Sequence, residues 1–179
     1  MIIYITGLSS SGKTTVGRLV HKLWSSSIDN VLFIDGDEIR QILGQFSEHD
    51  TFTAEARHEV AWRYARLCKW LDSQGMHAVC CTISYFEDVR EFNRNELSEY
   101  FEVFLDVSVE TIVRRDKKNL YARGLRGEVK NIVGIDQLLE PPTNPHMHIM
   151  NDGDSDNLSD FAKEILSQAV PTIKKNSGD

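Results

Sequence analysis

The sequence has 179 residues, a length that corresponds to one domain, or to one domain with a mobile lid. Hydrophobic residues make up 41% and charged residues 26%, which is typical of a soluble folded protein and excludes a disordered or fibrous chain. The formal net charge of −7 argues against nucleic acid or an acidic membrane surface as the main partner.

The cysteines and the apolar runs indicate a cellular compartment. Cys68, Cys80 and Cys81 lack metal-ligand spacing, so we expect reduced, buried thiols in a cytosolic protein. The first apolar run is too short for a signal peptide, and no run approaches the length of a membrane span. The sequence therefore predicts a cytoplasmic protein that does not engage a membrane.

The chain opens with a nucleotide-binding pattern. Residues 2–5 are apolar and β-branched and predict a buried strand, and residues 16–23 carry apolar side chains at helical spacing. Between them, residues 7–15 read GLSSSGKTT, which fits G-x-x-x-x-G-K-[ST], the phosphate-binding loop of P-loop enzymes. A chance match in a Gly/Ser-rich turn is the alternative, and the correct flanks argue against it.

This order of strand, loop and helix places backbone N–H groups and the positive end of a helix dipole against phosphates. Lys13 adds a positive charge for the β- and γ-phosphates, and the Thr14 hydroxyl can ligate Mg²⁺. The predicted ATP-binding residues of the loop are Ser9, Ser10, Ser11, Gly12, Lys13, Thr14 and Thr15.

Four further strands are predicted along the chain, each followed by a helical or loop segment. The strands cover residues 31–34, 76–83, 100–107 and, more weakly, 146–150. Helices are expected at 38–43, from a Thr53 cap to about 73, from about 87 to 99, at 109–115 after a Ser108 cap, and at 158–170. Residues 44–52 are predicted to be a loop, and residues 117–130 are rich in Lys, Arg and Gly with little periodicity.

Strands that alternate with helices predict an α/β fold, with a five-stranded parallel sheet covered by helices on both faces. We expect one P-loop kinase domain of the nucleoside-kinase type at residues 1–171, a basic lid at about 116–130 and a tail at 172–179. Ligands in such sheets bind outside the carboxyl ends of the strands. The P-loop and residues 35–37, 82–84 and 106–108 should therefore form one site.

Three motifs resemble those of one family. Residues 7–15 are similar to its GLSGSGKST, and residues 35–40 look like its DGDxxR. Residues 115–142 match RDPKGLY…GEIKGFTGID…EPP in order and at near-identical spacing. The sequence thus resembles the adenylylsulfate (APS) kinases over most of its length. The resemblance implies transfer of the γ-phosphate of ATP to the 3′-hydroxyl of adenylylsulfate, dependence on ATP and Mg²⁺, and a homodimer.

The resemblance also implies roles for the residues after the second strand. Lys13 and Asp37 would be catalytic, with Asp37 contacting the attacking hydroxyl; its alternative role is a helix N-cap. Asp35 would join Thr14 at the metal, or else cap the turn. Arg115 would lie near the ATP base or phosphates, and its alternative is a favourable charge at a helix C-terminus.

The acceptor half of the site departs from the family pattern. Arg40 and Arg57 are candidates to bind the anionic group of the acceptor, or else form surface ion pairs. The remaining predicted substrate-binding residues are Ile83, Ser84, Lys130 and Ile132. Ile132 stands where the family has a phenylalanine that stacks on adenine, and Val60 stands in place of an asparagine. Base–aromatic stacking is worth about 1–3 kcal/mol in single-strand nucleic-acid sites, so its loss could admit another base.

Several functions stay open at this point. Adenylylsulfate is the acceptor ranked first. The alternative is a pyrimidine nucleotide such as cytidine diphosphoramidate, which cousins of the family phosphorylate in capsule synthesis. A GTPase is disfavoured because the Asn-Lys-x-Asp motif is absent. A non-catalytic nucleotide-binding partner is disfavoured because Lys13, Thr14 and Asp37 are all retained.

Overall fold

The computed structural model describes residues 1–43, 53–116, 119–137, 140–153 and 157–170. Its centre is a five-stranded, fully parallel sheet in the order β2-β3-β1-β4-β5. The strands are β1 (Ile2–Thr6), β2 (Val31–Asp35), β3 (His77–Thr82), β4 (Tyr100–Asp106) and β5 (Met147–Met150). The predicted five-stranded parallel sheet is therefore confirmed.

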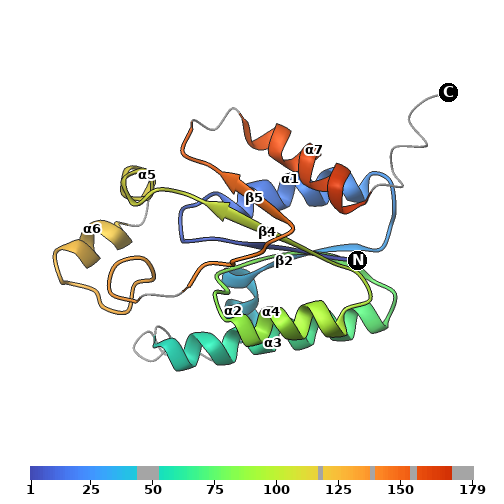
Figure 1. The fold of residues 1–179 in the computed structure, drawn as a ribbon, viewed down its shortest axis with the longest axis horizontal. Helices are drawn as coiled ribbons and strands as arrows, with labels where there is room; N and C mark the ends of the chain where they lie inside the picture. Colours follow the sequence, from blue (N-terminus) through green and yellow to red (C-terminus); the bar gives the residue numbers. More distant parts are fainter. Residues whose placement is uncertain (44–52, 117–118, 138–139, 154–156, 171–179) are drawn as a thin grey trace.

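Helices cover both faces of the sheet, as Figure 1 shows. The helices are α1 (Lys13–Ser25), α2 (Gly36–Leu43), α3 (Ala54–Ser73), α4 (Glu87–Glu96), α5 (Val109–Arg115), α6 (Leu120–Leu125) and α7 (Leu158–Ala169). Helices α1 and α7 pack together on one face, and α3 and α4 lie on the other. Helices α5 and α6 lie beyond the carboxyl ends of the strands (Figure 1).

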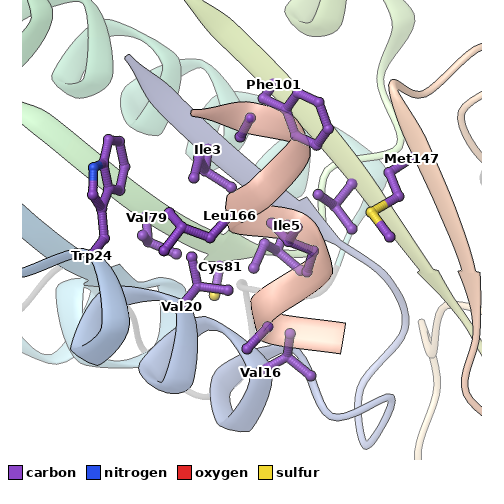
Figure 2. Close-up of a cluster of buried hydrophobic side chains, with 14 of the residues drawn as sticks. Ile3, Ile5, Val16, Val20, Trp24, Val79, Cys81, Phe101, Met147 and Leu166 are labelled. Atoms are coloured by element: carbon purple, nitrogen blue, oxygen red, sulfur yellow. The ribbon is translucent and has the colours of Figure 1, made fainter. Parts of the chain in front are cut away.

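The face under α1 and α7 holds the larger apolar core (Figure 2). Ile3 and Ile5 of β1 meet Val16, Val20 and Leu166 from the two helices. All five residues of β1 are buried, as expected for a central strand whose two faces are both covered. This packing anchors the start of α1, and with it the loop that precedes the helix.

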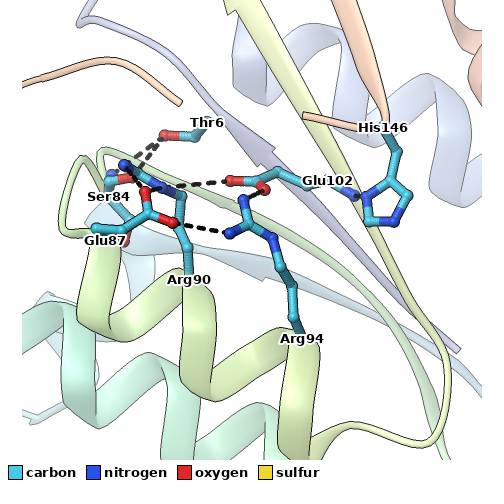
Figure 3. Close-up of polar contacts among 7 residues, drawn as sticks. All are labelled: Thr6, Ser84, Glu87, Arg90, Arg94, Glu102 and His146. Carbon is cyan, nitrogen blue, oxygen red and sulfur yellow. Dashed lines mark hydrogen bonds and ion pairs between the residues drawn. The ribbon is translucent and has the colours of Figure 1, made fainter. Parts of the chain in front are cut away.

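The face under α3 and α4 contains a buried ionic cluster, drawn in Figure 3. Glu102, in the middle of β4, is fully buried and accepts a hydrogen bond of 2.8 Å from Arg94 Nη2. Arg90, whose side chain is 3% exposed, donates from Nε to Glu87 Oε2 at 2.9 Å. Burial raises the pKa of Glu102, and the two arginines oppose that effect. These contacts attach α4 to the sheet directly after the loop at residues 83–86.

Local capping signals predicted the start of a helix correctly at two positions. Thr53 caps α3 by accepting the Ala56 N–H at 3.2 Å, and Ser108 caps α5 by accepting the Thr111 N–H at 3.3 Å. Helix α2 begins at Gly36, two residues earlier than predicted, because Asp35 Oδ1 accepts the Asp37 N–H at 2.8 Å. The predicted loop at 44–52 lies outside the described residues.

The lid segment (residues 116–130) is more regular than its composition predicts, because it contains helix α6. The Asp116 carboxylate accepts the N–H groups of Leu120, Tyr121 and Ala122, which stabilises the start of this helix. The absence of a side chain at Gly124 allows close packing, since a Cβ there would lie 2.4 Å from Ile132 Cδ1. The domain boundary at 171 and the limits of the lid stay predictions.

Candidate active site

The P-loop connects β1 to α1 at the carboxyl end of the central strand. The Ser11 N–H donates to Leu8 O at 3.2 Å, and Gly12 has a φ of +96°, a left-handed conformation that favours glycine. Ser9 and Ser10 are partly exposed, Ser11 is buried, and Thr15 is exposed on the first turn of α1. The loop is therefore a tight turn that leads directly into the N-terminus of a helix.

Lys13 is the first residue of α1 and its ammonium group folds back over the loop. Lys13 Nζ donates to Leu8 O at 2.6 Å. Burial lowers the pKa of Lys13 to about 8, and the nearby charge of Arg40 acts in the same direction. The ammonium group is therefore poorly solvated and would gain from an anion placed beside it.

Thr14 and Asp35 meet although 21 residues separate them. Thr14 Oγ1 donates to Asp35 Oδ2 at 2.7 Å, and Asp35 is 6% exposed at the end of β2. A hydroxyl and a carboxylate side by side are oxygen donors of the kind that Mg²⁺ prefers. The interpretation of Asp35 as a cap of the turn has a structural basis, since its other oxygen accepts the Asp37 N–H at the start of α2, and its metal role stays a prediction.

Asp37 lies in the first turn of α2 and forms an ion pair with Arg40 of the same helix. The side chains are 58% and 39% exposed, so solvent reaches both partners of the pair. A substrate anion could therefore compete for Arg40 and release the Asp37 carboxylate. Tyr64 supports this turn from α3, because its hydroxyl donates to Gly36 O at 2.7 Å.

Arg57 connects α3 to the loop that follows the lid segment. Arg57 Nη2 donates to Asn131 O at 3.0 Å, and the Asp136 carboxylate accepts the N–H groups of Asn131 and Ile132. Burial lowers the pKa of Arg57, and the positive charge of Arg40 lowers it further. The charge of Arg40 lowers the pKa of Lys13 as well.

The other predicted acceptor-binding residues differ in exposure. The Ser84 side chain is buried, and the residue is anchored to β1, where its N–H donates to Thr6 Oγ1 at 3.2 Å. Ile83 is half-buried in an apolar cluster with Tyr85 and Phe104. Lys130 is exposed, whereas Ile132 is 3% exposed in a cluster of apolar side chains that belong to α5, α6 and the loops beside them. Only Lys130 of these residues projects freely into solvent.

Arg115 lies on the other side of the P-loop, at the end of α5. Arg115 Nη1 donates to Asn151 O at 2.8 Å, and the other Nη donates to Gly153 O. The side chain of Asn151 reaches the P-loop, where Nδ2 donates to Ser11 O at 2.8 Å. Sequence reasoning missed Asn151, although its position directly after the fifth strand places it at the ligand-binding edge of the sheet.

Comparisons with known proteins identify the family of this chain. A family model described as adenylylsulphate kinase matches residues 1–150. The cytidine diphosphoramidate kinase of Campylobacter jejuni is 36% identical over 141 residues, which cover 79% of this chain and 81% of that protein. The adenylyl-sulfate kinase of Halothermothrix orenii is 35% identical over 150 residues, which cover 84% and 80%.

The fold also matches a solved structure of the family. The APS kinase of Mycobacterium tuberculosis, solved in complex with AMPPNP and APS, superposes with a TM-score of 0.80 at 28% identity, covering 93% of this chain and 95% of that one. Within the described residues, no helix combines the length and apolarity needed to cross a membrane. The chain therefore belongs to the adenylylsulphate kinase family and is an ATP-dependent phosphotransferase that acts on a hydroxyl group.

Proposed function

We propose that this enzyme transfers the γ-phosphate of ATP to the 3′-hydroxyl of a nucleoside that carries an anionic 5′-phosphate derivative. Adenylylsulfate is the acceptor that we rank first, and the product of its phosphorylation is 3′-phosphoadenylylsulfate. The observation that supports this best is the hydrogen bond from Thr14 to Asp35, directly beside Lys13 at the start of α1. Lys13, whose pKa burial lowers, and Arg40, whose ion pair with Asp37 is open to solvent, are suited to bind the anions of two substrates.

The residues divide into a donor set and an acceptor set. On the donor side, the P-loop N–H groups and Lys13 would bind the phosphates of ATP, and Arg115 would lie near its base. Thr14 and Asp35 would hold Mg²⁺, which supplies charge neutralisation at the transferred phosphate. On the acceptor side, Arg40 and Arg57 would bind the 5′ anion, with Ile83, Ser84, Lys130 and Ile132 around the nucleoside.

Asp37 would act on the attacking hydroxyl. It follows Asp35, the proposed Mg²⁺ ligand, by two residues, and its side chain is 58% exposed in the first turn of α2. A carboxylate in this place can accept the hydroxyl proton or orient the hydroxyl toward the γ-phosphate. Binding of the acceptor anion to Arg40 would free Asp37 for this task.

The alternative acceptor is a pyrimidine nucleotide such as cytidine diphosphoramidate. Ile132 offers an aliphatic contact where the family has an aromatic one, so a purine gains less from it. The Campylobacter jejuni relative, named a cytidine diphosphoramidate kinase, is as similar to this chain as the adenylyl-sulfate kinase named above. Specificity is a difference between two affinities, and the loss of one purine contact reduces that difference.

The decisive experiment compares kcat/KM for adenylylsulfate and for cytidine diphosphoramidate in the wild type, in Ile132→Phe and in Ile132→Leu. Ile132→Leu controls for repacking, because Gly124 leaves little room beside this side chain. The stacking argument expects Ile132→Phe alone to favour adenylylsulfate. It is wrong if the wild type already uses adenylylsulfate efficiently and Ile132→Phe brings no gain. ATP binding without turnover of either acceptor would instead indicate a non-catalytic partner.

Assembly and compartment are part of the same proposal. The family resemblance supports a homodimer, which light scattering on the purified chain would test. Cys68, Cys80 and Cys81 are free and buried, which suits the reducing conditions of the cytoplasm.

A further inference from the structure

Asn151 joins three parts of the molecule through three different groups. Its backbone N–H donates to Asp106 O at the end of β4, and its backbone O accepts from Arg115 Nη1, both at 2.8 Å. Its side-chain Nδ2 donates to Ser11 O, also at 2.8 Å. The residue is 3% exposed, so these bonds are shielded from water. Asn151 thus connects the P-loop to the edge of the sheet and to a predicted ATP contact.

The bond to Ser11 fixes the orientation of one peptide unit in the P-loop. A trans peptide is planar, with its C=O and N–H groups pointing in opposite directions. When Asn151 holds the carbonyl of Ser11, the N–H of Gly12 must point away from Asn151. Gly12 is also the N-cap of α1, and N–H groups at such a position bind phosphates in P-loop proteins.

The Asn151 amide packs closely against the backbone at Gly12. A Cβ at Gly12 would lie 3.0 Å from Asn151 Nδ2, so the amide lies directly against the loop backbone. The Ser11 hydroxyl is buried and has no hydrogen-bond partner among the described residues. The Ser11 side chain therefore does not hold the loop in place, and the hydrogen bond from the Asn151 amide orients the peptide group between Ser11 and Gly12.

We propose that Asn151 is a positioning residue for ATP binding, which holds the Ser11–Gly12 peptide so that the Gly12 N–H faces the phosphates. It acts through the loop backbone and does not itself touch the substrate. The proposal concerns the ATP site alone and is independent of the identity of the acceptor.

The test measures ATP dissociation constants by equilibrium binding, without an acceptor, for the wild type, Asn151→Ala and Asn151→Asp. Removal of one positioned hydrogen bond is expected to weaken ATP binding about tenfold in Asn151→Ala. Asn151→Asp keeps the volume but places an anionic oxygen against Ser11 O, so its affinity should fall below that of Asn151→Ala. A residue that only fills space would give the opposite order, because aspartate preserves the packing.

Asn30→Ala is the matched control, since Asn30 Nδ2 also donates to a backbone carbonyl, that of Gly75, at 2.7 Å and away from the P-loop. Its ATP affinity should stay within twofold of the wild type. Equal ATP affinity in the wild type and Asn151→Ala overturns the proposal. If Asn151→Asp does not fold, the proposal is tested by the ratio of the ATP dissociation constants of Asn151→Ala and Asn30→Ala, which should be about ten and would be about one if the proposal were wrong. Failure of the wild type to bind ATP would refute the donor site itself, a different outcome from equal binding by all variants.

Discussion

The two halves of the candidate active site are built in different ways. In the donor half, short hydrogen bonds from the sheet hold the groups: Asp35 binds Thr14 at the end of β2, and Asn151 binds Ser11 after β5. In the acceptor half, Arg40 and Arg57 extend from α2 and α3 and use Asp37 and the Asn131 carbonyl as partners. Under the proposed roles, the donor half is preorganised, whereas Arg40 and Arg57 would exchange their internal partners for substrate.

This difference follows from what each half binds. The phosphates of ATP are invariant, so backbone N–H groups fixed by a parallel sheet suit them. An acceptor can vary, and side chains on helices can change without altering the sheet. Substitutions in the donor half should therefore reduce chemistry with any acceptor, whereas those in the acceptor half should change KM for one substrate.

The largest effect is expected for Lys13→Ala. The variant loses a half-buried positive charge that is proposed to bind the phosphates, and removal of one preorganised group of this kind typically lowers kcat by about 10²–10³. Steady-state turnover with saturating ATP measures the loss, and a thermal melt shows whether the fold is retained. Near-wild-type turnover by a folded variant would contradict a catalytic P-loop.

Asp37→Asn should come next, with kcat reduced about 10²-fold because a general base or hydroxyl-orienting carboxylate is lost. The ATP dissociation constant should stay close to that of the wild type, since the proposed role of Asp37 concerns the acceptor hydroxyl and its ion pair is with Arg40 of α2. Turnover and ATP binding are measured on the same preparation. A variant that melts earlier but turns over normally would show that Asp37 only stabilises the start of α2.

Arg57→Ala tests the acceptor half and should raise the acceptor KM about tenfold, since bonds from a charged donor are worth more than neutral ones. The ATP KM should change little. Arg66→Ala is the control from the same helix: Arg66 is exposed and lies over the Trp62 ring. Equal acceptor KM values in the two variants would remove Arg57 from the substrate site.

The smallest effect is a pH dependence of ATP binding. Burial lowers the pKa of Lys13 to about 8, and only the protonated amine attracts phosphate. ATP affinity should therefore fall as pH rises through 8, by about twofold between pH 7 and pH 8. The same titration with Lys13→Ala should be flat in this range. If the ATP affinity of Lys13→Ala still falls between pH 7 and pH 8, a group other than Lys13 is responsible for the pH dependence.

The sequence predicted most of the donor half. The P-loop, its flanking strand and helix, and the caps at Thr53 and Ser108 are local patterns, and the contacts that they specify span only a few residues. The alternation of strands and helices likewise predicted the parallel sheet, because parallel strands require crossover helices. The start of α2 was predicted two residues too late, although the hydrogen bond from the Asp37 N–H to Asp35 that marks it is local and the sequence already indicates Asp35 as an alternative cap of this turn.

The tertiary structure alone decided which distant residues meet. Asn151 binds the P-loop across 140 positions and Arg57 binds the Asn131 carbonyl across 74, and neither distance leaves a periodic signal in the chain. The role of Ile132 in substrate binding, predicted by resemblance, stays a prediction, and the structure adds that its side chain packs beside Gly124 and Tyr121. A sequence pattern records the hydrogen bonds and spacing of single elements, whereas long-range neighbours depend on how the sheet orders its strands and how closely the helices pack.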